Sequence, residues 1–437
     1  MFGKRSWRKT LTVGCLAWIL ASVALAEDWP QWRGPQRDGV WRETGIVSRF
    51  DRQRLQPVWK AEISSGYSGP TVANGRVYVT DRIASPQQLE RIHCWDWKSG
   101  IPIWSYQYEC PYKEVSYEAG PRAAVTIHDG RAYSLGTMGN LICLDAGTGT
   151  LLWKRDLYTE YDIRMPIWGI AAAPLIVDRM VIIQVGGNDG ACVVAFDRKD
   201  GHELWRALND RASYSSPILV EQGTSQVVVC WTGDSVAGME AYSGEVLWRF
   251  PFPPRSVIIG ISTPVVDRGQ LFVTSFYDGS LMLRLARSHP GVEEAWSACG
   301  VDEKHTEALH SIISTPILRG DYLYGVDSYG ELRCLDARTG KRIWEDRTAT
   351  PRARWSNIHF VQHEEDVWMF NERGELIISQ LSPAGFQEKS RSLLIDPTQE
   401  QLRQRNGVCW AHPAFANRHV FARNDKELIC VSLEAGQ

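Results

Sequence analysis

The sequence predicts an all-β fold, an eight-bladed β-propeller with four antiparallel strands in each blade. Three observations support it: a tryptophan motif that returns about every 48 residues, a proline-containing segment ahead of each unit, and two chain ends that each supply part of one sheet. A repeat of this length matches one propeller blade. No window shows a sustained apolar period of 3.6 residues, which argues against helical repeats.

The tryptophan motif predicts a β-hairpin in each unit. An acidic residue is followed three positions later by Ser, Thr or Asp, then by Gly, and Trp comes four residues after the Gly. An acidic side chain caps such a turn, glycine supplies its positive φ, and the Trp falls on one face of the returning strand. The motif occurs five times, ending at Trp104, Trp153, Trp205, Trp248 and Trp344.

A second signature predicts the inner strands. Proline is tolerated where a short strand begins at a sheet edge, because its missing N–H is not needed there. Seven such prolines precede an apolar run: Pro70, Pro121, Pro174, Pro217, Pro264, Pro316 and Pro413. A degenerate unit between Trp344 and Pro413 brings the number of predicted blades to eight.

The two ends of the repeat region are complementary. The last unit, residues 411–433, provides three strands, whereas residues 57–63 read as an outer strand without a blade. Pairing them closes the ring and removes two exposed sheet edges. We therefore expect one propeller domain over residues 57–433, preceded by a leader segment over residues 27–56.

The first 26 residues read as a cleaved secretory signal peptide. Four basic residues precede an apolar stretch over residues 11–25, and Ala24 and Ala26 provide the small side chains for cleavage after Ala26. The apolar stretch is shorter than the roughly 20 residues that cross a bilayer, so we expect no transmembrane segment in the mature chain. An uncleaved anchor is the alternative. The predicted location is the periplasm or the exterior.

The net charge argues against nucleic-acid partners, and the cysteine positions argue against a disulfide framework. Without residues 1–26 the chain keeps 44 basic and 51 acidic residues, a net charge of −7, which disfavours nucleic acid as a partner. Four of the nine remaining cysteines, Cys94, Cys143, Cys334 and Cys430, recur at one motif position. We expect them to be buried as small hydrophobic residues rather than paired. A propeller needs no partner to bury its core, so a monomer is expected.

Residues just before the proline positions are predicted to converge on the propeller axis. They include cations and large aromatic side chains, which a strand start does not require for turn formation, and they predict a funnel for a small polar or anionic ligand. The candidate ligand-binding residues are Arg122, which comes just after its proline, and Trp168, Arg211, Tyr214, His310, Arg354, Trp355, Trp410 and His412, with Tyr67 beside them. Acidic turn residues such as Asp81, Asp234, Asp278 and Asp327 are expected on the same face of the ring. Turn formation alone is sufficient to explain why these residues are acidic.

The motif resembles the tryptophan-docking motif of the pyrroloquinoline quinone (PQQ) repeat superfamily of eight-bladed propellers. It is most complete at Asp145 to Trp153 and at Asp336 to Trp344, and the resemblance covers nearly all of the mature chain. The resemblance implies that each Trp packs against the next blade. Residues 28–35 are similar to the beginning of exported PQQ-repeat proteins without assigned function.

The resemblance leaves two function classes open. One is a non-catalytic exported propeller, similar to BamB, that binds a protein partner in the cell envelope or a small polar ligand. The other is a PQQ-dependent oxidoreductase, whose members hold the quinone with adjacent disulfide-bonded cysteines and a calcium ion. Because this chain has no adjacent cysteines and no Cys-x-x-Cys-His haem motif, we expect the first class, with no catalytic residue, cofactor or metal. His359 and His363 flank a strand and turn, so they are not expected to bind a metal.

Overall fold

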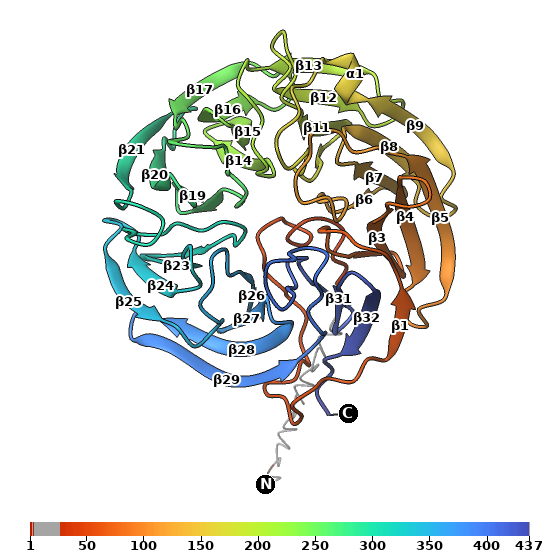
Figure 1. Cartoon of the computed structure of the whole chain (residues 1–437). Helices are drawn as coiled ribbons and strands as arrows, with labels where there is room; N and C mark the ends of the chain where they lie inside the picture. The colour runs from red at the N-terminus through yellow and green to blue at the C-terminus, as the bar shows by residue number, and fades with distance from the viewer. Residues whose placement is uncertain (2, 4–26, 437) are drawn as a thin grey trace.

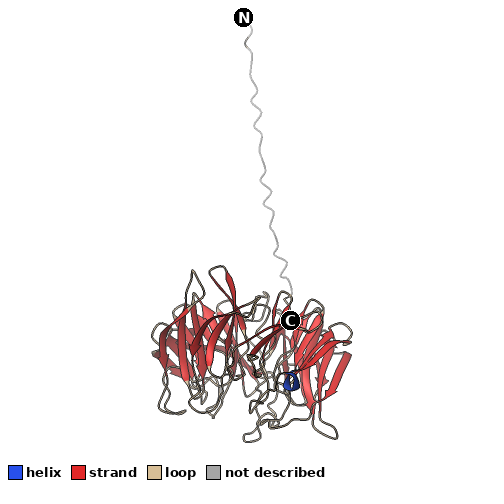
Figure 2. Cartoon of the chain, turned by 90° about the horizontal axis from the view of Figure 1, so that it is seen from above, coloured by secondary structure: helices blue, strands red, loops and turns tan. Residues whose placement is uncertain are grey.

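The protein forms a closed ring of eight four-stranded antiparallel sheets around one axis (Figure 1). The computed structural model describes residues 1, 3 and 27–436. The signal peptide predicted at residues 1–26 lies outside the described residues apart from Met1 and Gly3. Figure 2 shows the ring nearly edge-on, with α1 (Leu157–Glu160) as its short helix. Within the described residues, no helix has the length and apolar character to cross a membrane.

The first four blades follow the chain in order, each from its inner to its outer strand. Blade 1 contains β2 (Thr71–Ala73), β3 (Arg76–Ile83), β4 (Leu89–Asp96) and β5 (Pro102–Glu109). Blade 2 contains β6 (Thr126–His128), β7 (Arg131–Leu135), β8 (Asn140–Asp145) and β9 (Leu151–Asp156). Blade 3 contains β10 (Leu175–Val177), β11 (Met180–Gln184), β12 (Val193–Asp197) and β13 (Glu203–Ala207). Blade 4 contains β14 (Ile218–Gln222), β15 (Ser225–Trp231), β16 (Ser235–Glu240) and β17 (Val246–Pro251).

The remaining blades include the degenerate unit, which forms a complete sheet as blade 7. Blade 5 contains β18 (Val265–Asp267), β19 (Gln270–Ser275), β20 (Gly279–Leu285) and β21 (Val292–Ala298). Blade 6 contains β22 (Ile317–Arg319), β23 (Tyr322–Val326), β24 (Leu332–Asp336) and β25 (Arg342–Asp346). Blade 7 contains β26 (Ile358–His363), β27 (Asp366–Asn371), β28 (Glu375–Ser382) and β29 (Gly385–Leu393). Blade 8 contains β30 (Ala414–Ala416), β31 (His419–Arg423), β32 (Glu427–Ser432) and β1 (Trp59–Glu62).

The two chain ends close the ring as the sequence predicts. Strand β1 pairs antiparallel with β32, with Trp59 opposite Cys430 and Glu62 opposite Glu427. Blade 8 is therefore built from both ends of the repeat region, and its outer position is filled by the N-terminal strand. The predictions of eight blades, four antiparallel strands per blade and closure by residues 57–63 are confirmed.

The motif tryptophans dock between neighbouring blades. Trp104 of blade 1 donates its indole N–H to the carbonyl of Ala146 in blade 2 at 3.1 Å. Its ring covers Gly149 so closely that a Cβ there would lie 2.6 Å from the indole. Trp59 repeats the contact at the closure, donating to the carbonyl of Trp97 at 2.7 Å. Glycine in each motif is thus needed both for its positive φ and for the close approach of a ring.

The recurring cysteines lie opposite these tryptophans. Cys94 pairs in register with Trp104, and Cys143, Cys334 and Cys430 pair with Trp153, Trp344 and Trp59 in the same way. All four are buried, and the nine described cysteines are free thiols. Burial raises the pKa of Cys94 to about 12, so its thiol stays protonated and unreactive. The prediction that these cysteines are small hydrophobic residues is confirmed.

The leader, residues 27–56, lies against the ring rather than apart from it. It crosses the face that carries the turns between first and second strands, where Trp29 bridges to Val72 in blade 1 and Val40 to Gln362 in blade 7. The buried Arg37 side chain donates to the carbonyl of Pro174 in blade 3 at 2.9 Å. The leader therefore reaches into the central channel and joins blades on opposite sides of the ring.

Candidate functional site: an aromatic cavity on the propeller axis

A cavity with a volume of about 160 Å³ lies on the axis. It is lined chiefly by the loops that connect the outer strand of one blade to the inner strand of the next, here called interblade loops. We call this space the axial cavity. Its aromatic lining consists of Trp32, Tyr67, Tyr117, Trp168, Tyr214, Trp355 and Trp410. The remaining lining consists of Arg122, Ala124, Ala171, Ala173, Ser216, Ile261, Ile312, Ile313, His359 and His412.

Six of the nine candidate residues from the sequence line this cavity. They are Arg122, Trp168, Tyr214, Trp355, Trp410 and His412. They come from the interblade loops that enter blades 2, 3, 4, 7 and 8, so residues far apart in the sequence meet at one point. The other three, Arg211, His310 and Arg354, are not among the residues that line it.

Tyr117 stands at the centre of the aromatic wall. Its ring centroid lies 6.0 Å from Trp168, 5.8 Å from Trp355 and 6.5 Å from Trp410. Trp168 in turn packs against Tyr214 at 5.2 Å. The first two contacts are edge-to-face, an arrangement that aromatic quadrupoles favour. The rings therefore support one another and form one continuous aromatic wall of the cavity.

The leader contributes Trp32 to the lining. The indole N–H of Trp32 donates to the Thr263 hydroxyl of blade 5 at 2.8 Å, and the ring meets His412 edge-to-face at 4.5 Å. The leader enters the channel from the face that carries the turns between the first and second strands of the blades. Trp32 therefore lines the end of the cavity that is opposite the interblade loops. The cavity is consequently open on one face of the ring and closed by the leader on the other.

Two neutral histidines lie at the inner end of the cavity. Burial lowers the pKa of His359 to about 4 and that of His412 to about 3. His359 Nε2 lies 2.8 Å from the carbonyl of Trp410. His412 Nδ1 lies 3.3 Å from the carbonyl of Pro413, whereas its buried Nε2 has no hydrogen-bond partner among the described residues. With the proton assigned to Nδ1 by this contact, Nε2 is an acceptor without a partner, covered by neighbouring side chains beside the cavity.

Arg122 is the single cationic residue of the described lining, and its donors are already committed. Its Nη2 donates to the carbonyls of Ser116 and Tyr117, and its Nη1 donates to the carbonyl of Gly120 and the Thr137 hydroxyl. The guanidinium also lies 5.0 Å from the centre of the Tyr67 ring. Arg122 therefore fastens the interblade loop before blade 2 and has few donors left for an anion.

The turn acids hold the interblade loops in place. In four blades an aspartate between the second and third strands accepts a hydrogen bond from a backbone N–H of the preceding interblade loop, and in blade 1 Asp81, inside the second strand β3, does the same. The pairs are Asp81 with Ser64, Asp234 with Arg211, Asp278 with Arg255, Asp327 with His310 and Asp425 with Glu400. These carboxylates position the loops that line the cavity and are not part of the lining.

Arg211 and Arg354 form ion pairs away from the cavity. The exposed Arg211 donates Nε to Asp234 at 3.0 Å. Arg354 donates to both oxygens of Glu303, at 2.9 and 2.8 Å, and stacks 4.6 Å from the Trp355 ring. Arg354 therefore packs against the Trp355 ring and helps to fix its position. A sequence offers no means of distinguishing a cation that faces a cavity from one that pairs with an acid of another loop.

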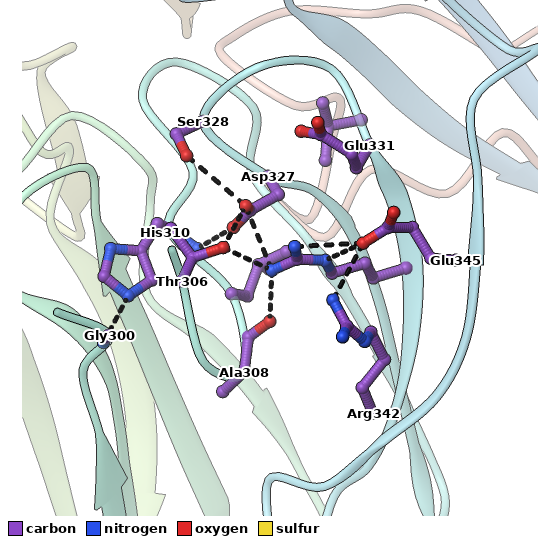
Figure 3. A network of polar contacts seen from close by, with 12 residues as sticks. Gly300, Thr306, Ala308, His310, Asp327, Ser328, Glu331, Arg342 and Glu345 are labelled. Atoms are coloured by element: carbon purple, nitrogen blue, oxygen red, sulfur yellow. Dashed lines mark hydrogen bonds and ion pairs between the residues drawn. The ribbon is translucent and has the colours of Figure 1, made fainter. Parts of the chain in front are cut away.

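His310 belongs to a buried polar network in blade 6 (Figure 3). Its Nδ1 lies 3.0 Å from the carbonyl of Phe276, and its Nε2 accepts from the N–H of Gly300 at 3.2 Å. Burial lowers its pKa. Asp327, which accepts from the His310 backbone, also pairs with the buried Arg333 at 3.0 Å. Both ring nitrogens of His310 are satisfied, so this residue fixes a loop.

Sequence reasoning missed Tyr117, Trp32 and His359. Tyr117 lies in the middle of a long interblade loop with a φ of 58°, four residues before the proline used as a landmark. Trp32 belongs to the leader, which carries no repeat. The cluster Trp29-Pro30-Gln31-Trp32 was the available signal, since two tryptophans in a short segment before the repeats have no role in the docking motif.

The charge state of the lining limits what the cavity accepts. Burial raises the pKa of Tyr214 to about 12 and also raises that of Tyr117, so these hydroxyls stay neutral. No carboxylate is among the lining residues. No group of three or more His, Cys, Asp or Glu side chains suited to a metal occurs within the described residues. The cavity thus favours an uncharged group that packs against aromatic rings.

Known proteins similar to this chain include both a dehydrogenase and an assembly factor. The chain is 26% identical over 190 residues to 1-butanol dehydrogenase (cytochrome c) of Thauera butanivorans, covering 42% of this chain and 26% of that protein. It is 22% identical over 245 residues to outer membrane protein assembly factor BamB of Shewanella oneidensis, covering 53% of this chain and 61% of that one. The chain thus spans about a quarter and three fifths of these two relatives.

The solved structure of BamB from Moraxella catarrhalis shares the fold. It superimposes with a TM-score of 0.58 at 15% identity, covering 86% of this chain and 99% of that one. The sequence pattern of the family described as outer membrane protein assembly factor BamB matches residues 109–346 and 189–437, which together span most of the chain. This chain therefore belongs to that family, within the superfamily of PQQ-repeat propellers.

Proposed function

We propose that this chain is an exported, non-catalytic propeller whose axial cavity binds a small, uncharged, ring-containing group. The occupant is either a free ligand or an aromatic side chain that a protein partner in the cell envelope inserts. The observation that carries the proposal is the lining, in which seven aromatic rings and no carboxylate surround about 160 Å³. An apolar cavity of roughly 150 Å³ accommodates benzene, so a single ring is of suitable size.

His412 adds a preference within this class. Its Nε2 is buried in the cavity wall, is neutral and lacks a partner among the described residues. We infer that the donor of a ring with an O–H or N–H reaches this acceptor when the side chains that cover it shift on binding, whereas a purely hydrocarbon ring leaves it unpaired. A hydrogen bond gained by this acceptor is worth a net of about 0.5–1.5 kcal/mol. Phenol should therefore bind up to about tenfold more tightly than toluene, which has a similar size and no donor.

A PQQ-dependent oxidoreductase is the second candidate, because relatives of the chain include a dehydrogenase. PQQ carries three carboxylates, and the residues of the axial cavity do not fit it. The guanidinium of Arg122 already donates to backbone carbonyls, and the lining has no acidic side chain that could ligate a calcium ion beside the quinone. No adjacent cysteines are present to lie against the quinone ring. We derive no redox step for this chain.

A binding measurement tests the proposal. Tryptophan fluorescence of the mature protein is titrated with phenol, with toluene, and with PQQ plus Ca²⁺. We expect saturable quenching by phenol, weaker quenching by toluene, and neither quinone absorbance nor dye-linked alcohol oxidation with PQQ. Quinone binding together with alcohol oxidation would establish the second candidate instead.

Tyr117→Ala gives the matching variant. It removes the ring that contacts three others, so we expect at least about a tenfold weaker affinity for phenol. Tyr158→Ala, at an exposed tyrosine outside the cavity, is the control and should bind as the unaltered protein does. If phenol displaces an envelope protein held by the propeller, the natural occupant is a side chain. A small molecule that co-purifies and competes with phenol would identify a free ligand.

A further inference from the structure

Glu27, the residue after the predicted cleavage point, is fixed by three hydrogen bonds. Its backbone nitrogen donates to Glu43 Oε1 at 2.9 Å, and its own carboxylate accepts from the N–H of Arg42 at 3.1 Å. Its carbonyl accepts from the N–H of Asn417, in the first turn of blade 8, at 3.2 Å. Sequence reasoning chose this position from small side chains on its N-terminal side, and the structure independently holds it by hydrogen bonds to the leader and to blade 8.

The carboxylate that receives Glu27 is buried and lacks a cation. Glu43 is 3% exposed. Its Oε2 accepts from the Trp41 indole N–H at 2.8 Å and from the Arg418 N–H at 2.8 Å. No Lys, Arg or His side chain lies within ion-pair distance of it in the described part of the chain. A buried carboxylate normally has a cationic partner, because desolvating an isolated charge is costly.

We propose that Glu43 is the receptor for the α-ammonium group that export processing creates at Glu27. In that step a water molecule adds across the peptide bond between Ala26 and Glu27, catalysed by an endopeptidase specific for small residues. The C–N bond breaks, the leaving segment keeps a carboxylate, and the Glu27 amine takes up a proton. An α-amino group has an ordinary pKa of about 7.7–8.0 and gains further protonation beside a carboxylate. The neutral N–H contact to Glu43 becomes a charge-assisted ion pair at the same place.

This ion pair joins three parts of the fold at one carboxylate. Trp41 of the leader, Arg418 of the β30–β31 turn in blade 8 and Glu27 at the new N-terminus all donate hydrogen bonds to the Glu43 carboxylate. Trp41 is itself packed against Phe415 at 5.1 Å and Trp368 at 5.5 Å. Processing thereby anchors the segment that carries Trp32 into the axial cavity.

The test compares two N-termini in two backgrounds. The mature chain beginning at Glu27 is released without extra residues from a fusion, and a second form keeps a Gly-Ser extension before Glu27. Each is prepared with Glu43 and with Glu43→Gln, and Asp51→Asn, an exposed leader carboxylate, is the control. We expect the extension to lower the Tm by about 2 °C or more with Glu43 and with Asp51→Asn, and to have no effect with Glu43→Gln.

The reactivity of the α-amine gives a second readout. At pH 7 the amine of the mature chain should react at least about fivefold more slowly with an acylating reagent than the amine of the Glu43→Gln chain, because pairing keeps it protonated. If Glu43→Gln fails to fold, Glu43→Asp, which withdraws the carboxylate by one methylene, should give the same faster reaction. Mass spectrometry of the exported protein should show Glu27 as the first residue. A different first residue, an extension effect independent of Glu43, or equal amine reactivity would overturn the proposal.

Discussion

The rim and the axis of this propeller are built by different rules. At the rim, one contact recurs: Trp104 over Gly149 and Trp59 over Gly100 have the same geometry, and a Cβ on either glycine would lie 2.6 Å from the ring. At the axis, every blade contributes a different loop, and a non-repeating leader adds Trp32. The repeat therefore specifies a ring that can carry many different axial sites, and it does not specify which site is present.

The largest expected effect comes from opening the rim. Replacing residues 57–63 with a Gly-Ser linker of equal length removes β1 and the Trp59 contact, and it exposes the edge of β32. Burial of one tryptophan alone is worth about 3–5 kcal/mol, so we expect the unfolding free energy of the whole ring to fall by at least about 5 kcal/mol. Denaturant unfolding monitored by circular dichroism measures this. Local fraying with an unchanged midpoint would argue that blade 8 is stable without closure.

A single methyl group tests the docking contact itself. Gly149 and Gly130 have nearly equal φ values of +72° and +71°, but a Cβ at Gly149 would meet Trp104 at 2.6 Å, whereas a Cβ at Gly130 has no neighbour within 4 Å. Both Ala variants pay the same backbone strain. Gly149→Ala should therefore be about 1–3 kcal/mol less stable than Gly130→Ala, because it alone overpacks the interface. Equal losses would mean that the glycine is required only for its φ.

Much of the rim could be predicted from residues alone, because its determinants are local and periodic. The acid, Gly and Trp positions located the hairpins, and the partial strands at the two ends predicted the pairing of Trp59 with the last blade. The axis depends on contacts between distant loops. Arg122 directly follows Pro121, and Arg211 lies six residues before Pro217. Neither position reveals that Asp234 holds Arg211 away from the cavity, whereas Arg122 folds back onto its own loop. Whether an arginine faces the cavity depends on its hydrogen-bond partners, and only the folded ring defines where those partners lie.

The buried histidines of the axis predict an acid-sensitive interior. The folded pKa values of His359 and His412, about 4 and about 3, lie below the unfolded value of about 6.5. Below pH 6.5 the unfolded chain therefore binds more protons than the folded chain. The contribution of these two histidines to the free energy of unfolding is fully present above pH 6.5 and is lost as the pH falls toward 4. Each histidine contributes up to about 1.4 kcal/mol per pH unit in that window. His412→Phe should flatten the profile of unfolding free energy between pH 6.5 and 4, and an unchanged slope would place His412 in contact with solvent.

The most direct test of the account locates an occupant in the axial cavity. A crystal of the mature protein with bound 4-bromophenol would give an anomalous bromine signal. We predict the peak inside the axial cavity, beside Tyr117, with the phenol oxygen toward His412 Nε2, and the loss of that peak in Tyr117→Ala. A bromine peak only at the outer surface, or PQQ bound on the axis in its place, would contradict the proposal that this propeller binds an uncharged ring.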